Sequence, residues 1–258
     1  DAKGKVRGNL TFTEVVLIET QEEIKESIVH QLNNGLHISA VVAFDFTGSN
    51  GDPKQPHSLH YLDGRNQYRD AASAVIPIID QYDSDGSYPV YGFGMTYDRR
   101  TVDHCKLLSS DAKYADGVVM QYESTIHGNG FQLSGPTYFA PIINAVSRMA
   151  GENKQTYTVL VIFTDGAIND MDQTIEAIVA ASYKPMSIII VGIGNADFGP
   201  MNRLDNDGKP TLKDRNGRIA KRDIVQFVPI RECPDGPTLQ AATLAELPRQ
   251  ILEFNNFA

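Results

Sequence analysis

Short apolar runs alternate along this chain with longer segments whose apolar residues recur at helical spacing. Two of the runs, 38–44 (ISAVVAF) and 158–163 (TVLVIF), are almost continuously apolar. A mostly parallel sheet with helices on both faces produces this pattern, because its central strands are buried on both sides. The sequence therefore predicts an α/β fold with a doubly wound, mostly parallel sheet.

The pattern also sets the order of the elements. The run 102–107 is short and polar, as an edge strand tends to be. The segment 205–223 is charged and contains glycine, so we expect an exposed loop there. Strands are predicted at 38–44, 89–93, 102–107, 158–163, 187–192 and 224–228, and helices at 67–82, 114–126, 138–150, 172–182, 197–204 and 244–254.

Composition excludes several classes of function. The 258 residues include 23 Lys and Arg against 32 Asp and Glu, a formal net charge of −9. This balance disfavours nucleic acid and unassisted docking to an anionic membrane. No apolar run approaches the roughly 20 residues of a membrane-spanning helix. The two cysteines, Cys105 and Cys233, form no zinc-site spacing and suit a cytoplasmic protein.

Polar residues follow the buried strands at the places where a doubly wound sheet binds ligands. Asp45 follows the run 38–44 directly, with Thr47 and Ser49 just beyond it, and Asp165 follows the strand at 158–163. The carboxyl ends of parallel strands meet at one edge of the sheet. Thr137, at the mouth of a predicted helix, can reach the same edge.

These two carboxylates and three hydroxyls form a ligand set of oxygens only, the kind that Mg²⁺ and other hard cations prefer. Because hydroxyls are neutral, they would leave a divalent cation under-neutralised and able to attract a carboxylate from outside. The positive end of the helix predicted near 138 would favour the same incoming carboxylate. The plainer interpretation is that Asp-x-Thr-x-Ser arose by chance at a loop start, where such residues also cap helices.

The segment 45–53 (DFTGSNGDP) resembles the metal-ion-dependent adhesion motif of von Willebrand factor A domains, in the form found in copines. Five further stretches are similar to copines and occur in the same order: YGFG (91–94), GPTYFAPIINAV (135–146), VLVIFTDGAINDMDQTIEAIVAAS (159–182), PMSIIIVGIGNADF (185–198) and RDIVQFVPIR (222–231).

The resemblance implies a six-stranded sheet with one antiparallel edge strand. It assigns metal binding to Asp45, Thr47 and Ser49 in a first loop, Thr137 in a second and Asp165 in a third. The expected cofactor is Mg²⁺ or Mn²⁺, the expected partner is a protein that supplies Asp or Glu to the metal, and the module is expected not to be an enzyme.

Copines carry two calcium-dependent, phospholipid-binding C2 domains ahead of this module. By this resemblance, residues 1–23 are the remnant of a preceding C2 domain plus a linker, and 24–258 are a copine-type A domain. A membrane would be reached on a calcium signal, and only through C2 domains that this chain does not contain.

Other functions are weaker alternatives. Asp45 could serve a Mg²⁺-dependent phosphoryl hydrolase as nucleophile, but Thr47 stands where such enzymes need a second carboxylate. His57 and His60 are expected on the surface. Asn50 and Asp52 are expected either to orient the motif loop or to form a plain turn.

Overall fold

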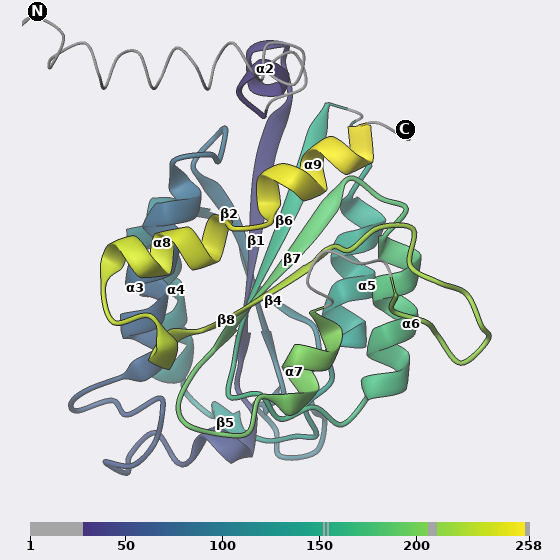
Figure 1. Ribbon diagram of the computed structural model, residues 1–258. Helices are drawn as coiled ribbons and strands as arrows, with labels where there is room; N and C mark the ends of the chain where they lie inside the picture. The colour runs from purple at the N-terminus through teal and green to yellow at the C-terminus, as the bar shows by residue number, and fades with distance from the viewer. Residues whose placement is uncertain (1–27, 152, 154, 206–210, 256–258) are drawn as a thin grey trace, which may run out of the picture. The chain divides into compact units, whose positions relative to one another are not determined.

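The computed structural model describes residues 28–151, 153, 155–205 and 211–255. The chain divides into two units, Asp1–Leu36 and His37–Ala258. In the described part of the first unit, a short helix, α2 (Ile28–Asn33), is followed by a turn. The predicted C2 remnant at 1–23 lies outside the described residues. The second unit contains the sheet and its helices (Figure 1).

The sheet has six strands in the order β4-β2-β1-β6-β7-β8, and only β4 runs antiparallel to its neighbour. This confirms the predicted fold. The first strand, β1, lies in the middle of the sheet. β2 and β4 follow on one side of it, and β6, β7 and β8 are then added on the other. The strands are β1 (His37–Asp45), β2 (Ser87–Phe93), β4 (Lys106–Lys113), β6 (Thr156–Thr164), β7 (Met186–Gly192) and β8 (Val225–Pro229).

Burial of the central strands fixes the sheet edge that carries the candidate site. Every residue of β7 is buried, as is all of β6 after its first residue. Phe44 of β1 stacks on Phe163 of β6 with ring centroids 5.2 Å apart. Removing one such side chain from water contributes about 1.5–3 kcal/mol to stability. The carboxyl ends of β1 and β6 are therefore held rigidly by the core.

Helices cover both faces of the sheet (Figure 1). α3 and α4 pack against each other on one face, and α5 and α6 do so on the other. Helix 114–126 is found at its predicted bounds. The helices are α3 (Gln67–Asp80), α4 (Tyr114–Ile126), α5 (Ala140–Met149), α6 (Met171–Ala181), α7 (Gly199–Leu204), α8 (Gly236–Leu244) and α9 (Leu247–Asn255). None of the described helices is long and apolar enough to cross a membrane.

Two predictions about elements are wrong, and one helix was not predicted. The edge strand is β4, Lys106–Lys113, not 102–107, because one side of an edge strand faces solvent and its apolar pattern is weak. The helix predicted at 244–254 is found as α9, Leu247–Asn255. The preceding helix, α8, was not predicted; it begins where Asp235 accepts a hydrogen bond from the Thr238 N–H. Part of the segment 205–223 is buried, including Arg222 and Asp223.

A second, two-stranded sheet was not predicted. It pairs β3 (Met95–Thr96) with β5 (Gln132–Leu133) in antiparallel fashion. Next to it, an isolated bridge joins Thr47 to Ser134. These contacts bring the segment before α5 against the loop that follows β1, and so bring two of the predicted metal-binding loops together.

Candidate metal centre

The carboxylates of Asp45 and Asp165 lie at the same edge of the sheet. Asp45 is the last residue of β1, and Asp165 follows Thr164, the last residue of β6. The two strands are parallel neighbours, with Phe44 opposite Phe163. Strand order reverses between them, which is where doubly wound sheets bind their ligands.

Three hydroxyl side chains reach this edge from two loops. Thr47 and Ser49 lie in the loop after β1, which includes the 3₁₀ turn η2 (Gly48–Asn50), and Thr137 precedes α5. Thr47 Oγ1 is 2.6 Å from Asp45 Oδ1, 3.0 Å from Ser49 Oγ and 3.2 Å from Thr137 Oγ1. The structure thus joins four of the predicted residues in one chain of hydrogen bonds, with Asp165 beside them.

The hydrogen bonds among these hydroxyls have one direction, from Ser49 and Thr137 to Thr47 and from Thr47 to Asp45. Thr47 has one hydroxyl proton and donates it to the Asp45 carboxylate. Ser49 must therefore be the donor in its contact with Thr47, and Thr137 donates to Thr47 as well. The Thr47 N–H and the Thr164 hydroxyl also donate to Asp45, at 2.9 Å and 2.7 Å.

These donors do not offset the electrostatic cost of burying Asp45. The pKa of Asp45 is raised to about 7, first by burial and then by the negative charge of Asp165, while the hydrogen bonds from Thr47 and Thr164 act in the opposite direction. Asp45 is 0% exposed and Asp165 5%. Within the described residues, no lysine or arginine forms an ion pair with either.

A network of buried polar side chains supports the loop that follows β1. The Asn50 side chain donates to the Thr47 carbonyl at 3.1 Å and accepts from the Tyr68 hydroxyl at 2.7 Å. Its amide also lies 3.4 Å from both Oδ1 and the carbonyl oxygen of Asp45. These contacts hold the motif loop, which is the first of the two roles expected for Asn50. The exposed Asp52 accepts the Lys54 N–H at 3.0 Å, which is a turn contact.

The prediction that His60 lies on the surface is wrong. His60 is 0% exposed, and its Nε2 lies 3.0 Å from the Asp45 carbonyl oxygen. Because a carbonyl oxygen only accepts, Nε2 carries the proton and donates. Burial lowers the pKa of His60 to about 3, so the ring is neutral. The other ring nitrogen lies 2.7 Å from the Tyr122 hydroxyl, which ties the end of β1 to α4.

The segment after β6 holds the loop that carries Thr137 in place. Asn169 and Thr137 exchange two hydrogen bonds, N–H to Oδ1 at 2.8 Å and N–H to carbonyl at 2.9 Å. Asp170 accepts the N–H groups of Phe139 and Ala140 at the start of α5, at 3.0 Å and 2.9 Å. The expectation that this helix end favours an incoming carboxylate is thus corrected, because Asp170 already occupies those donors.

Sequence reasoning missed four residues of this centre: Thr164, Asn169, Asp170 and His60. The position of Thr164 at the end of an apolar run was a usable signal, since strand ends define the sheet edge. The other three act through loops whose path the sequence pattern does not specify.

A second acidic cluster lies near the start of β8. One carboxylate oxygen from each of Asp205, Asp223 and Glu246 lies within 4.8 Å of the others. Asp205 accepts the Phe227 N–H at 2.8 Å, and Arg249 lies 2.9 Å from Glu246. These contacts tie the cluster into the surrounding structure.

Comparison with known proteins places this fold in a known class. The SpRpn10 VWA domain superposes with a TM-score of 0.50 at 13% identity, covering 80% of this chain and 93% of that one. The fold is that of a von Willebrand factor A domain. A family model described as Copine matches residues 58–258. The chain belongs to the copine family.

Two curated relatives from Arabidopsis thaliana, Protein BONZAI 1 and Protein BONZAI 2, are each 40% identical to this chain over 246 residues. The match takes in 90% of this chain and 42% of each relative. The chain therefore spans less than half the length of these relatives.

Proposed function

We propose that this domain binds Mg²⁺ or Mn²⁺ and uses the ion to hold an acidic residue of a protein partner. The observation that carries the proposal is the burial of Asp45 beside Asp165 with three hydroxyls next to them and, in the described part of the chain, no ion pair to a cationic side chain. A divalent cation would remove the repulsion between the carboxylates, and the oxygen-only donor set fits a hard ion.

The five residues divide into two roles in this proposal. Asp45 and Asp165 supply negative charge to the ion, directly or through water. Thr47, Ser49 and Thr137 supply neutral oxygens. The bound ion would supply positive charge at the sheet edge, toward which a partner's carboxylate is drawn. The chain carries a net charge of −9, so the ion would offset the repulsion that an acidic partner otherwise meets.

The cellular setting is also a proposal. In a longer copine with two C2 domains, this module would work in the cytoplasm and reach membranes on a calcium signal through those domains. The module itself would contribute the protein contact and no catalysis.

Thermal unfolding with and without Mg²⁺ or Mn²⁺ tests the proposed metal site. An ion that binds only the folded state stabilises it by mass action, by about 2.7 kcal/mol when its concentration is 100 times its Kd. The melting temperature rises accordingly. Asp45→Ala should abolish the rise. Asp52→Ala, which removes an exposed carboxylate from the same loop, should keep it. An equal rise in both variants, or none in the unmodified domain, would refute the proposed site.

The phosphoryl-hydrolase alternative has its own measurement. A strand-terminal carboxylate beside a bound Mg²⁺ can act as a nucleophile. Here Thr47 occupies the position of the second carboxylate and donates its proton to Asp45. Metal-dependent hydrolysis of p-nitrophenyl phosphate that Asp45→Asn removes would favour the enzyme. We expect no such hydrolysis.

A further inference from the structure

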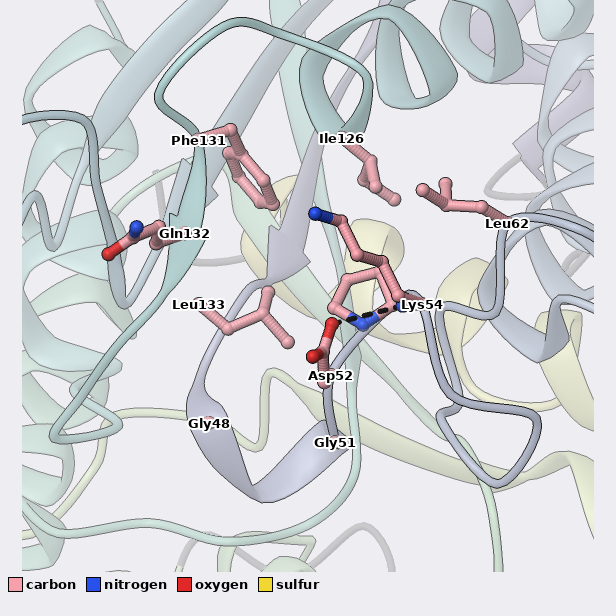
Figure 2. A pocket seen from close by; sticks show the side chains of 10 residues that line it. Gly48, Gly51, Asp52, Lys54, Leu62, Ile126, Phe131, Gln132 and Leu133 are labelled. Atoms are coloured by element: carbon pink, nitrogen blue, oxygen red, sulfur yellow. Dashed lines mark hydrogen bonds between the residues drawn. The ribbon is translucent and has the colours of Figure 1, made fainter.

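A groove of about 460 Å³ lies beside the candidate metal centre (Figure 2). This volume is within the range of about 300–1,000 Å³ that is usual for ligand pockets. The backbone of Gly48 and Gly51 forms one wall. Apolar side chains from three separate segments contribute the rest together with Pro53, Asp52 and Gln132, and one lysine, Lys54, reaches in from the rim. The apolar side chains are Leu62, Ile126, Phe131 and Leu133.

The apolar wall of the groove is built before any ligand arrives. The Phe131 ring meets Phe46 edge-on at 5.2 Å and Tyr97 at 6.0 Å. Leu133 is held in β5 by pairing with Met95, and the Leu62 N–H donates to the Pro53 carbonyl at 2.9 Å. A surface fixed in this way loses little conformational entropy when a ligand side chain enters.

The groove and the metal centre share their walls. Gly48, which lines the groove, stands between Thr47 and Ser49 in the motif loop. Its N–H donates to the Ser134 carbonyl at 2.5 Å, and Ser134 directly follows Leu133 of the groove. An extended chain advances about 3.3–3.6 Å per residue. A peptide with a carboxylate on the ion can therefore place a side chain in the groove a few residues away.

The charge at the rim suits an acidic partner. In Figure 2 the Lys54 side chain points toward Phe131 and Ile126 and away from the Asp52 carboxylate. Asp52 accepts the backbone N–H of Lys54, and in the part of the chain that the structure describes Lys54 makes no ion pair. A positive charge is thus available next to the groove on a chain of net negative charge.

We propose that this groove selects the partner: it takes a large apolar side chain, such as Leu or Phe, from the same peptide segment whose Asp or Glu reaches the ion. A second acidic residue of that segment pairs with Lys54. This inference rests on the proposed metal-dependent function. The inference adds a recognition rule to that function: the partner segment carries an acidic residue, a large apolar residue and a second acidic residue within a few positions of one another.

Selection of random displayed peptides on the Mg²⁺-loaded domain tests this rule. We expect the selected peptides to combine a large apolar residue with two acidic residues, and to be released by EDTA. Replacing the apolar residue of a selected peptide by alanine should weaken binding about tenfold, a change of about 1.4 kcal/mol.

Charge reversal at the rim gives a second measurement on a residue outside the metal site. Lys54→Glu should weaken a selected peptide about fivefold or more, and exchanging the second acidic residue of the peptide for lysine should restore binding. Lys184→Glu, at the amino end of β7 and so at the opposite end of the sheet, is the matched control and should leave binding unchanged. Both lysine variants should keep the Mg²⁺-dependent rise in melting temperature.

The outcomes separate the two proposals. The groove proposal alone is overturned if a domain that keeps its Mg²⁺ response gives one of three results. These are selection of acidic peptides with no apolar preference, selection of apolar peptides that bind equally in EDTA, and selection of no peptide at all. A domain without a Mg²⁺ response refutes the metal site itself.

Discussion

The two ends of the sheet each bury charge, and they treat it differently. At the amino ends of β6 and β7, Arg222 is 3% exposed. Its guanidinium donates to the carbonyls of Lys184, Met186 and Gln250 at 2.5, 2.6 and 3.1 Å, and to the Tyr157 hydroxyl at 2.8 Å. The protein itself therefore disperses the charge of Arg222.

At the carboxyl ends of β1 and β6, the carboxylate of Asp45 receives hydrogen bonds but faces a second carboxylate, that of Asp165. Burying a charge without an opposite charge costs several kcal/mol. Arg222 thus has its charge compensated within the fold, whereas the negative charge at the other end is uncompensated, and the metal ion that we propose would offset it.

The largest effect is expected at Arg222. Arg222→Met should lower the free energy of unfolding by about 3–5 kcal/mol, because it leaves buried carbonyls and a hydroxyl without their donor. Arg215→Met removes an arginine whose exposed side chain pairs with Glu176 and should cost below about 1 kcal/mol. Urea denaturation measures both. Similar small losses in the two variants would show that Arg222 is not a structural charge.

In metal-free protein, Asp45→Asn should raise the free energy of unfolding instead of lowering it. Folded Asp45 keeps its proton up to about pH 7, whereas the unfolded chain releases it near the ordinary value of 3.8. The folded state therefore binds more protons between these values, and metal-free stability falls as the pH rises from about 4 to about 7.

Asp45→Asn should remove this part of the pH dependence, on the order of a few kcal/mol. The measurement is the difference between the urea-unfolding free energies of the two proteins across that pH range. Mg²⁺ should restore the stability of the unmodified protein at pH 7 and leave Asp45→Asn unchanged. Parallel pH profiles without metal would show that Asp45 carries no electrostatic cost.

A smaller effect is expected at Gly94, which follows β2. Gly94 has φ +75, and a Cβ there would overlap Thr47 Cγ2. Gly94→Ala should displace Thr47, cost about 1–3 kcal/mol and weaken the Mg²⁺ response. Gly217→Ala is the control, because its φ is +85 but only the flexible Lys213 side chain lies near. An equal Mg²⁺ response in both variants would argue against a role for Thr47 at the ion.

The sequence predicted the parts of the site that lie at strand ends. The buried runs before Asp45 and before Asp165 show the ends of β1 and β6, and the parallel pattern puts those ends together. Thr137 was placed with them from its position at a helix start and by resemblance to copines. Whether the five residues bind a metal stays a prediction.

Residues whose role depends on loop paths could not be predicted. His60 looks like a surface residue in sequence, but the turns after η2 bring it under Asp45. Arg222 lies in a charged stretch, and the packing of β6, β7 and α9 around it makes it buried. The edge strand β4 was misplaced because its residues Ser109, Ser110 and Asp111 carry no apolar alternation.

Crystals grown with Mn²⁺ and measured for anomalous scattering would show whether the five residues bind an ion. We expect one manganese peak among the oxygens of Asp45, Ser49 and Thr137, with Thr47 and Asp165 beside it, and no such peak for Asp45→Ala. A peak elsewhere, or a lysine or arginine side chain lying between Asp45 and Asp165, would contradict the proposed metal site.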